Sequence, residues 1–198
     1  MITTLESPAT TLLLVDLQLG FDEPRWGRRN NPSLEPRAAA LLRAWRAAGR
    51  PVVHVKHMST DPFSPLRPGQ SGNDFKPETA PVAGEPVIEK RVNSAFIGTS
   101  LEDDLRHAGC RGLVIAGLTT NHCVSTTARM AGNLGFATWV VSDATATFDR
   151  VGPDGAAHPA EQIHAIALSD LHGEFATVVD TATVLAALEL PRSSRKAA

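Results

Sequence analysis

The sequence predicts an α/β fold in which a parallel sheet carries helices on both faces. Short apolar runs of strand length alternate with amphipathic stretches of helix length, which is typical of parallel pairing with right-handed crossovers. The chain has 198 residues, enough for one well-formed core and rather short for two. We therefore expect a single domain over 1–198 with a three-layer, Rossmann-like arrangement and a six-stranded sheet. The expected strands lie at 11–15, 52–55, 87–89, 113–116, 137–141 and 175–179.

The first part of the chain supplies three of these strands and one long helix. The run at 11–15 is almost entirely apolar, as expected for a strand that is buried on both faces. The segment 33–48 places its apolar residues on one helical face, and Gly49 and Pro51 then end the helix. The runs at 52–55 and 87–89 are the second and third strands. The apolar face consists of Leu34, Ala38, Leu41, Leu42, Trp45 and Ala48.

The second part of the chain continues the alternation. Thr99 and Glu102 have the spacing of a capping box, which predicts a helix running to Gly109. A helix is expected from about 159 to 172, and Asp180 can cap a last helix that ends before Pro191. Residues 192–198 are expected to form a frayed tail.

The connection from His57 to Pro86 is the longest irregular segment. A connection of this length in a compact domain is usually either functional or disordered, and its many prolines favour an ordered excursion. We expect it to cover the pocket or to reach a neighbouring subunit, rather than to be a plain surface loop.

Composition indicates an ordinary soluble domain. The hydrophobic share is 42% and the formal net charge is −2, so no basic surplus suggests nucleic acid as a partner. The N-terminus lacks a signal-peptide pattern, and no apolar run approaches the length needed to span a membrane. We therefore expect a cytoplasmic protein. Two cysteines, Cys110 and Cys123, give no disulfide framework, and Cys110 is interpreted as structural.

Gly117 to Val124 is the most informative segment, because it follows the strand at 113–116 and opens a helix-like stretch. A strand that turns into a helix in this way places the first helical N–H groups, and here the Cys123 sulfur, at the carboxyl edge of the sheet. The helix dipole favours negative charge there, so Cys123 is a candidate for a stabilised thiolate, the attacking form of cysteine. The structural alternative is a small buried hydrophobe.

Two charged residues are expected at the same edge of the sheet. The first strand ends at Asp16, and the third strand ends at Lys90. A carboxylate can take the thiol proton, and an ammonium can favour the thiolate and hold the carboxylate in place. Each residue also has an ordinary explanation, since aspartate is a frequent turn former and a lone lysine is usually a solvated surface charge.

These segments resemble the isochorismatase-like cysteine hydrolases, a family that includes nicotinamidases and N-carbamoylsarcosine amidohydrolases. The matching pieces are Leu14 to Gln18 with Phe21, Glu89 to Phe96, and Gly117 to Val124, and the resemblance runs from about Leu12 to about Val179. It implies a catalytic triad of Asp16, Lys90 and Cys123 that hydrolyses a C–N bond through a thioester.

The resemblance implies further features of the site. The N–H groups of Thr119 and Cys123 would form an oxyanion hole, beside a non-proline cis peptide between Leu118 and Thr119. The loops at 26–32 and 64–69 are similar to the branch that contains streptothricin hydrolase, which opens a lactam in an antibiotic. The expected substrate is therefore a small-molecule amide or lactam, with no cofactor. Similar proteins assemble as dimers or tetramers, so we expect a homo-oligomer.

Substrate contacts are harder to assign from the sequence. Phe21, Trp26 and Phe96 follow catalytic residues closely and can form an apolar wall, although buried aromatic residues are more often simple packing. Asn121, beside the nucleophile, is a further candidate. His122 is a poor base for Cys123, because sequence neighbours at a helix start point in different directions.

A metal site is not expected. Nicotinamidases of the family use an Asp-x-His arrangement after the second strand, whereas the corresponding stretch here is His54-Val55-Lys56-His57-Met58. Strand periodicity directs His54 and His57 to opposite faces, and no aspartate stands two residues before either. Glu161 and His164 lie three residues apart on a helix, which is usually a solvated face.

Several alternatives stay open. An isochorismatase would cleave a vinyl ether with Asp16 and no thiol, so the presence of Cys123 favours an amidase. A nicotinamidase-like amidase is a second alternative, although the missing metal ligands weigh against nicotinamide. A phosphatase would need an acid where the chain has Gln18. A non-catalytic scaffold with the same fold is the alternative of a different class.

Overall fold

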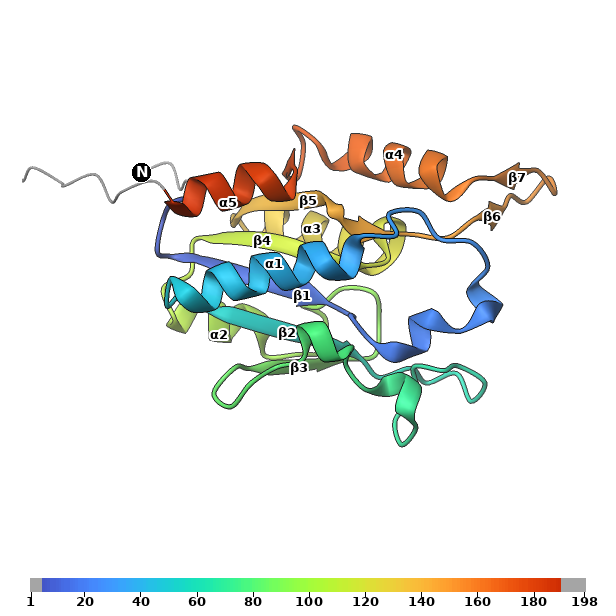
Figure 1. The fold of residues 1–198 in the computed structure, drawn as a ribbon, viewed down its shortest axis with the longest axis horizontal. Coiled ribbons are helices and arrows are strands. Elements are labelled where there is room, and N and C mark those ends of the chain that lie inside the picture. Colours follow the sequence, from blue (N-terminus) through green and yellow to red (C-terminus); the bar gives the residue numbers. More distant parts are fainter. Residues whose placement is uncertain (1–4, 190–198) are drawn as a thin grey trace, which may run out of the picture.

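A computed structural model describes residues 5–189 of the chain. Six parallel strands form one sheet in the order β3-β2-β1-β4-β5-β8, and Figure 1 shows the helices covering both faces. The predicted fold class and strand number are confirmed. The strands are β1 (Thr10–Val15), β2 (Val52–His57), β3 (Val87–Lys90), β4 (Gly112–Leu118), β5 (Ala137–Ala146) and β8 (Thr177–Val179).

Within residues 5–189, five α-helices and several short elements accompany the strands. The helices are α1 (Leu34–Ala47), α2 (Leu101–His107), α3 (Ser125–Asn133), α4 (Ala160–Leu171) and α5 (Thr181–Glu189). The 3-10 turns are η1 (Leu19–Asp22), η2 (Pro24–Trp26), η3 (Ser71–Asn73) and η4 (Pro77–Thr79), and η5 (Thr120–Val124) is a π-helical turn. A two-stranded hairpin is formed by β6 (Arg150–Val151) and β7 (Ala157–His158).

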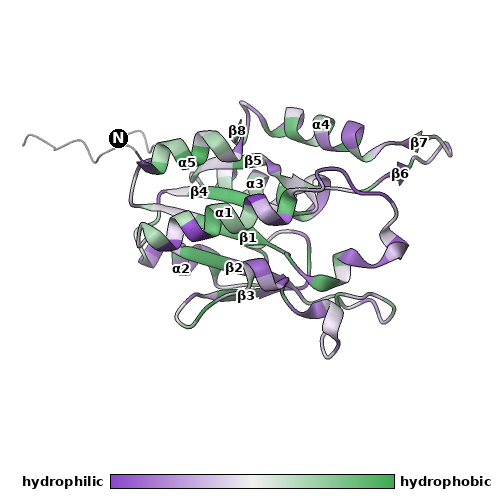
Figure 2. Cartoon of the chain, viewed as in Figure 1, coloured by the Kyte–Doolittle hydropathy of each residue, from purple (hydrophilic) through white to green (hydrophobic). Residues whose placement is uncertain are grey.

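The sheet divides the apolar core into two halves. On one face α1 and α5 pack around the fully buried Trp45, and on the other face α2, α3 and α4 pack around residues such as Ile115 and Leu171. Figure 2 shows the hydrophobic colour concentrated in the central strands and on the inner sides of the helices. Strands buried on both faces are expected to be continuous apolar runs, and every residue of β1 and β4 is buried.

Some local details differ from the sequence-based expectations. The Thr99–Glu102 capping box does not form, because the helix begins at Leu101 with Ser100 before it, and the Glu102 carboxylate pairs with Arg106. Asp180 does cap the last helix, where its Oδ1 accepts the N–H of Thr183 at 2.8 Å. The predicted tail at 192–198 lies outside the described residues. The sequence also gave no sign of the β6–β7 hairpin, which lies at the carboxyl side of the sheet (Figure 1).

The long segment 57–86 is an ordered excursion, as its prolines predicted. The buried Gln18 side chain donates to the carbonyls of His57 and Asn73, and its Oε1 accepts the N–H of His57 at 2.8 Å. The segment also packs closely on η1, since a Cβ added to Gly20 of η1 would lie 2.8 Å from the carbonyl oxygen of Gly72. It is thus fixed to the chain that follows β1, beside the carboxyl edge of the sheet. Among residues 5–189, no helix is long and apolar enough to cross a membrane.

Candidate active site

Three residues from separate strands meet where the strand order of the sheet reverses. Asp16 follows β1, and Cys123 lies in the turn after β4, the strand that pairs with β1. Lys90 ends β3, two strands away, and its long side chain reaches both residues: Nζ lies 2.6 Å from Asp16 Oδ2 and 3.2 Å from Cys123 Sγ. Ligand sites of open α/β sheets lie at this kind of switch point. The structure therefore brings together the three residues expected at this edge.

Gly117 sets the separation between Asp16 and the nucleophile turn. Its φ is +130°, and it pairs with Val15 across the β1–β4 ladder. A Cβ at this position would lie 1.9 Å from the carbonyl oxygen of Val15, which no side chain can tolerate. Asp16, the residue after β1, also has a left-handed backbone with a φ of +52°, a conformation in which aspartate is less disfavoured than most residues. The backbone therefore has a positive φ both after β1 and in β4, at the point where the triad residues meet.

The Lys90 ammonium is saturated by three acceptors. An ammonium has three N–H donors, and besides Asp16 and Cys123 it lies 3.0 Å from Nδ1 of His57. The ammonium and the Asp16 carboxylate are fully buried. The cost of removing both charges from water exceeds their mutual attraction unless the remaining donors and acceptors of a buried ion pair also form hydrogen bonds. The third acceptor completes that requirement for Lys90.

His57 is a site residue that sequence reasoning did not assign. It stands in register with Lys90 on the neighbouring strand, and the buried Gln18 holds its backbone N–H and carbonyl. Burial and the adjacent ammonium lower the pKa of His57, so the ring is neutral and Nδ1 is free to accept. The available signal was its place at the end of the second strand, at the edge shared with Asp16 and Lys90. His54, as periodicity predicted, faces the other way and contacts Glu85 at 2.8 Å.

Cys123 is a protonated thiol in the resting site. Burial, together with the Asp16 carboxylate, raises the pKa of Cys123 to about 12, although Lys90 acts in the opposite direction. The expectation of a thiolate stabilised by the helix start is therefore wrong, because desolvation and the carboxylate outweigh the favourable charges. Cys123 as a whole is 8% exposed. Oδ1 of Asn93, an exposed residue, lies 3.9 Å from the sulfur. The thiol therefore needs a base to become a nucleophile.

A base stands beside the thiol. An oxygen of Asp16 lies within 4.8 Å of the sulfur, and Asp16 Oδ1 is buried without a hydrogen-bond partner among the described residues. An unpaired buried carboxylate oxygen is a ready proton acceptor. Lys90 meanwhile binds the other oxygen of the carboxylate. Burial alone would lower the pKa of Lys90, but Asp16 and Cys123 raise it, so the amine is charged.

The nucleophile turn has an uncommon backbone. The Leu118–Thr119 peptide is cis, as the resemblance implied, and η5 is a π-helical turn in which the carbonyl of Thr119 accepts the N–H groups of both His122 and Val124. Single π-turns are frequent at functional sites. Thr119 and Cys123, whose N–H groups are the expected oxyanion donors, are both buried in this turn.

The site supplies its own cation. Asp16, His57 and Cys123 present three possible metal-ligand atoms that lie within 4.8 Å of one another. Lys90 Nζ is 2.6 to 3.2 Å from an atom of each of these residues, so the ammonium takes the position that a metal ion would need. The donor set therefore does not fit a metal as long as Lys90 is in place.

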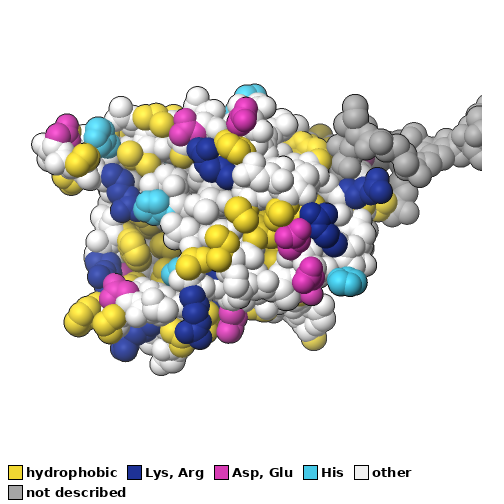
Figure 3. Space-filling view, turned by 180° about the vertical axis from the view of Figure 1, so that it is seen from behind, with side chains coloured by type: hydrophobic (Ala, Val, Ile, Leu, Met, Phe, Trp, Pro, Cys, Tyr) yellow, Lys and Arg dark blue, Asp and Glu magenta, His cyan; other side chains and the backbone are white. Residues whose placement is uncertain are grey.

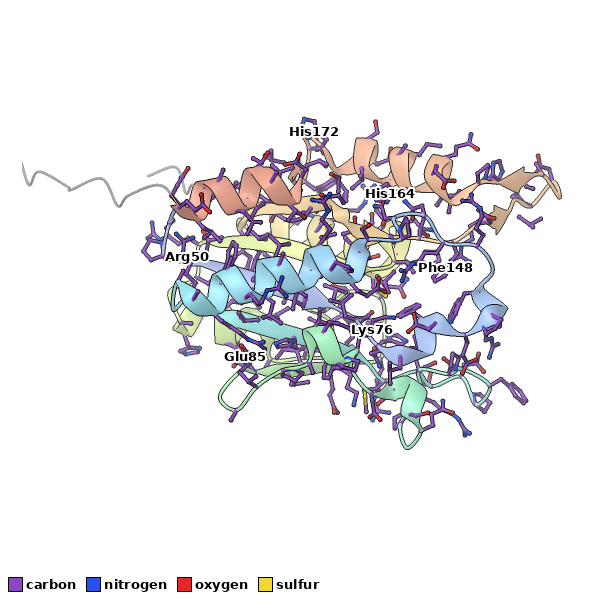
Figure 4. All side chains as sticks on the ribbon, viewed as in Figure 1. Arg50, Lys76, Glu85, Phe148, His164 and His172 are labelled. Atoms are coloured by element: carbon purple, nitrogen blue, oxygen red, sulfur yellow. The ribbon has the colours of Figure 1, made fainter. Side chains whose placement is uncertain are left out.

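The candidate substrate residues fall into two groups. Phe21 and Trp26 form an aromatic cluster with Phe148, with ring centroids 5.3 to 6.3 Å apart, and Phe148 lies at the carboxyl side of the sheet (Figure 4). Phe96 instead stacks on Phe136, which lies just before β5, so its ring packs in the core toward the amino edge of the sheet.

Asn121 is half-buried, and its Oδ1 accepts a hydrogen bond from the hydroxyl of Thr147 at 2.5 Å. Phe148 was not predicted, because it follows a strand that proved longer than its apolar run.

Helix α4 and the hairpin complete the surroundings of the turn. His164 of α4 (Figure 4) is hydrogen-bonded to the Thr120 hydroxyl at 2.8 Å. It therefore does not lie on a solvated face, contrary to the expectation, whereas Glu161 is exposed and pairs with Arg28. His122 contacts Arg150 of the hairpin rather than Cys123. Seen from behind, the molecule is hollowed at the carboxyl side of the sheet, and hydrophobic side chains lie in the hollow beside positive ones (Figure 3).

Known proteins are similar to this chain in sequence and in fold. An isochorismatase domain matches residues 10–183. An isochorismatase family protein of Bacillus subtilis (strain 168), YrdC, is 45% identical over 86% of this chain and 91% of its own. Streptothricin hydrolase of Streptomyces noursei is 32% identical over 72% of this chain and 56% of its own. A crystal structure of a putative hydrolase of the isochorismatase family from Chromobacterium violaceum is 49% identical, covers 92% of this chain and 94% of its own, and has a TM-score of 0.89.

Proposed function

The chain belongs to the isochorismatase family, and from that premise we propose that it is a cysteine-dependent amidohydrolase that cleaves a C–N bond of a small molecule. One observation carries the proposal: a single buried ammonium binds both a carboxylate and a thiol, at 2.6 and 3.2 Å. A vinyl ether hydrolase of the isochorismatase type has no use for a thiol placed in this way. An inert scaffold would have no reason to bury this set of charges, which are costly to desolvate.

The first half of the reaction forms a thioester. Asp16 takes the proton of Cys123 as the sulfur attacks the amide carbonyl, and Lys90 offsets the negative charge that passes from the carboxylate to the sulfur. The N–H groups of Thr119 and Cys123 receive the developing oxyanion. The protonated Asp16 then gives its proton to the departing amine as the C–N bond breaks.

The second half of the reaction restores the enzyme. Asp16, again a carboxylate, deprotonates a water molecule, which attacks the thioester carbonyl. The C–S bond breaks, the acid product leaves, and the thiolate recovers its proton from Asp16. Each proton taken by Asp16 is returned, so the cycle needs no cofactor.

The substrate we propose is a small amide or lactam. The similarity to streptothricin hydrolase supports a lactam of that type, and the aromatic cluster of Phe21, Trp26 and Phe148 offers an apolar wall near the site. The chemistry proposed for the triad is the same for cyclic and open-chain amides.

The proposal is tested with a panel of amides, ureas and lactams, streptothricin included. Wild type is expected to release acid and amine from at least one member, and Cys123→Ala is expected to lose that activity by several orders of magnitude while its unfolding midpoint stays close to wild type. Cys110→Ala is the matched control, because Cys110 is buried at the opposite edge of the sheet. Undiminished hydrolysis by a folded Cys123→Ala protein rules out the mechanism.

A further inference from the structure

Arg150 lies against the turn that carries the nucleophile. It begins the β6–β7 hairpin, and its Nη2 lies 3.0 Å from Nδ1 of His122, the residue before Cys123. Three residues earlier, Thr147 is bonded to Asn121 of the same turn. Phe148, between them, belongs to the aromatic cluster with Phe21 and Trp26. The segment that presents Arg150 is thus held to the nucleophile turn by two side-chain contacts.

The guanidinium of Arg150 has no anionic partner in the described part of the chain. Arg29 and Arg46 are also half-buried, and each makes two hydrogen bonds to a glutamate. For Arg150 no carboxylate of residues 5–189 lies within salt-bridge distance, and its Nε is buried without a hydrogen-bond partner. The neighbouring carboxylate of Asp149 is already bound by Arg28 and by the N–H of Ala160.

His122 satisfies only a small part of the Arg150 donors. A guanidinium has five N–H donors, and the single Nη2 lies 3.0 and 3.3 Å from the two ring nitrogens, whose lone pairs point in different directions. One N–H bonds one nitrogen at a time, so the remaining donors have no acceptor among residues 5–189, and Nε among them is buried. Burial and the charge of Arg150 lower the pKa of His122, so the ring is neutral and adds no competing charge.

A buried donor without a partner is costly, so native proteins rarely keep one unless water, an ion or a ligand completes it. The planar fork of arginine matches carboxylates, which it binds through two parallel hydrogen bonds. We propose that Arg150 binds a carboxylate of the substrate, so that the preferred substrate is an amide that also bears a carboxylate. This inference rests on the proposed function, because it assigns the substrate class of the same site.

The first test measures alkylation of Cys123 by iodoacetate and by iodoacetamide, which differ in the presence of a carboxylate. The ratio of the two rates cancels the thiolate fraction, so it reports only the preference for the anion. We expect a high ratio in wild type and a fall of about tenfold in Arg150→Gln, with Arg150→Lys in between because it keeps charge without the fork. Arg111→Gln is the matched control, since it removes an equal charge at the opposite, exposed edge.

The second test measures hydrolysis of dicarboxylic monoamides from malonamate to adipamate, and of 4-carbamoylbenzoate, each beside its methyl ester. Arg150→Gln is expected to raise the KM of the acids at least tenfold and to leave the esters unchanged, with little change in kcat. An equal effect on acid and ester, together with an unchanged alkylation ratio, overturns the carboxylate site. The carboxylate site is also overturned if Arg150→Gln changes the oligomeric mass but changes neither the alkylation ratio nor the ratio of KM between acid and ester. The guanidinium then serves a contact between copies of the chain.

The two proposals fail separately. If wild type hydrolyses none of the amides but keeps the iodoacetate preference that Arg150→Gln removes, the anion site stands and the proposed reaction is wrong. If neutral amides are hydrolysed well through Cys123 and Arg150→Gln changes nothing, the reaction stands and the anion site is wrong.

Discussion

Asp16 plays two opposing parts at the site, as the base for the thiol and as the charge that keeps the thiol protonated. Asp16→Asn keeps the size of the side chain and removes both functions. We expect amide hydrolysis to fall by about a thousandfold or more, because the base is lost. Alkylation of Cys123 by iodoacetamide at pH 8 should instead become at least about tenfold faster, because the Asp16 carboxylate raises the pKa of the thiol and Lys90 lowers it.

Mass spectrometry in a Cys110→Ala background follows Cys123 alone. In wild type the alkylation rate should rise through pH 8 to 10 without levelling, because the pKa of Cys123 is raised to about 12 and the thiolate fraction grows tenfold for each pH unit below it. A plateau near pH 7 contradicts the raised pKa. Slower alkylation of Asp16→Asn contradicts the part assigned to its charge.

His57 is expected to act as a positioning residue for Lys90. Its Nδ1 is the third acceptor of the ammonium, at 3.0 Å, so His57→Ala frees Lys90 to move away from Asp16 and Cys123. We expect kcat to fall by about 10 to 100-fold with a smaller change in KM, a loss typical of disturbed geometry. His57→Asn should recover most of the rate, because the amide oxygen occupies the place of Nδ1.

The pH dependence of this contact has a definite sign. The pKa of His57 is lowered, so the neutral ring that accepts from Lys90 persists at pH 6.5 and is lost only at more acidic pH. An acid loss of activity caused by His57 should therefore be absent from His57→Asn. Equal rates for the alanine and asparagine variants show that the acceptor does not position Lys90.

At the scale of single elements, β4 approaches β1 closely only because of Gly117. Gly117→Ala places a Cβ 1.9 Å from the carbonyl oxygen of Val15, at a φ of +130°. We expect a loss of more than about 4 kcal/mol in the free energy of unfolding, measured with urea, or failure to fold. Gly135→Ala is the control, because its φ of +84° also favours glycine but its Cβ meets nothing, so about 1 to 2 kcal/mol is expected. Similar losses in both variants contradict the close approach.

The end of the 57–86 segment is fixed by a charge network between α1 and β2. Glu85 binds Arg46 through both oxygens and contacts the buried His54, and these partners lower the pKa of Glu85 to about 2. A folded pKa below the unfolded value of 4.5 stabilises the protein above pH 4.5, and the contribution disappears as the pH falls toward 2. Glu85→Gln should therefore cost roughly 2 kcal/mol at pH 7 and about half as much at pH 3. A constant difference across this range shows that the charge does not hold the segment.

The sequence predicted those parts of the molecule that depend on local pattern. Apolar runs identified all six strands. Asp16, Lys90 and Cys123 stand at or after the ends of three of these strands, and they were expected at one edge because the carboxyl ends of parallel strands share it.

Contacts across long connections were not predictable. The register that sets His57 beside Lys90 and the contact of Arg150 with His122 depend on how distant segments dock. The stacking of Phe96 on Phe136 is a further contact of this kind, because Phe136 belongs to another strand connection. The homo-oligomer stays a prediction, which sedimentation of wild type will test.

The sheet has two edges, and a wide cleft lies at the edge opposite the triad. A cleft of about 1060 Å³ is lined by residues that precede β4, β5 and β8, among them Arg111 and Glu174. A cavity of this size is a natural candidate for a substrate site. Here, however, the thiol, its base and the unpaired Arg150 all lie at the carboxyl edge, so the cleft cannot present a substrate to them. Arg111→Glu and Glu174→Arg, which reverse charges in the cleft, should therefore change kcat/KM by less than about twofold on the substrates of the wild type. A tenfold loss in either variant, with unchanged stability and oligomeric mass, would move substrate binding to the amino edge and remove the argument that chemistry occurs at the switch point.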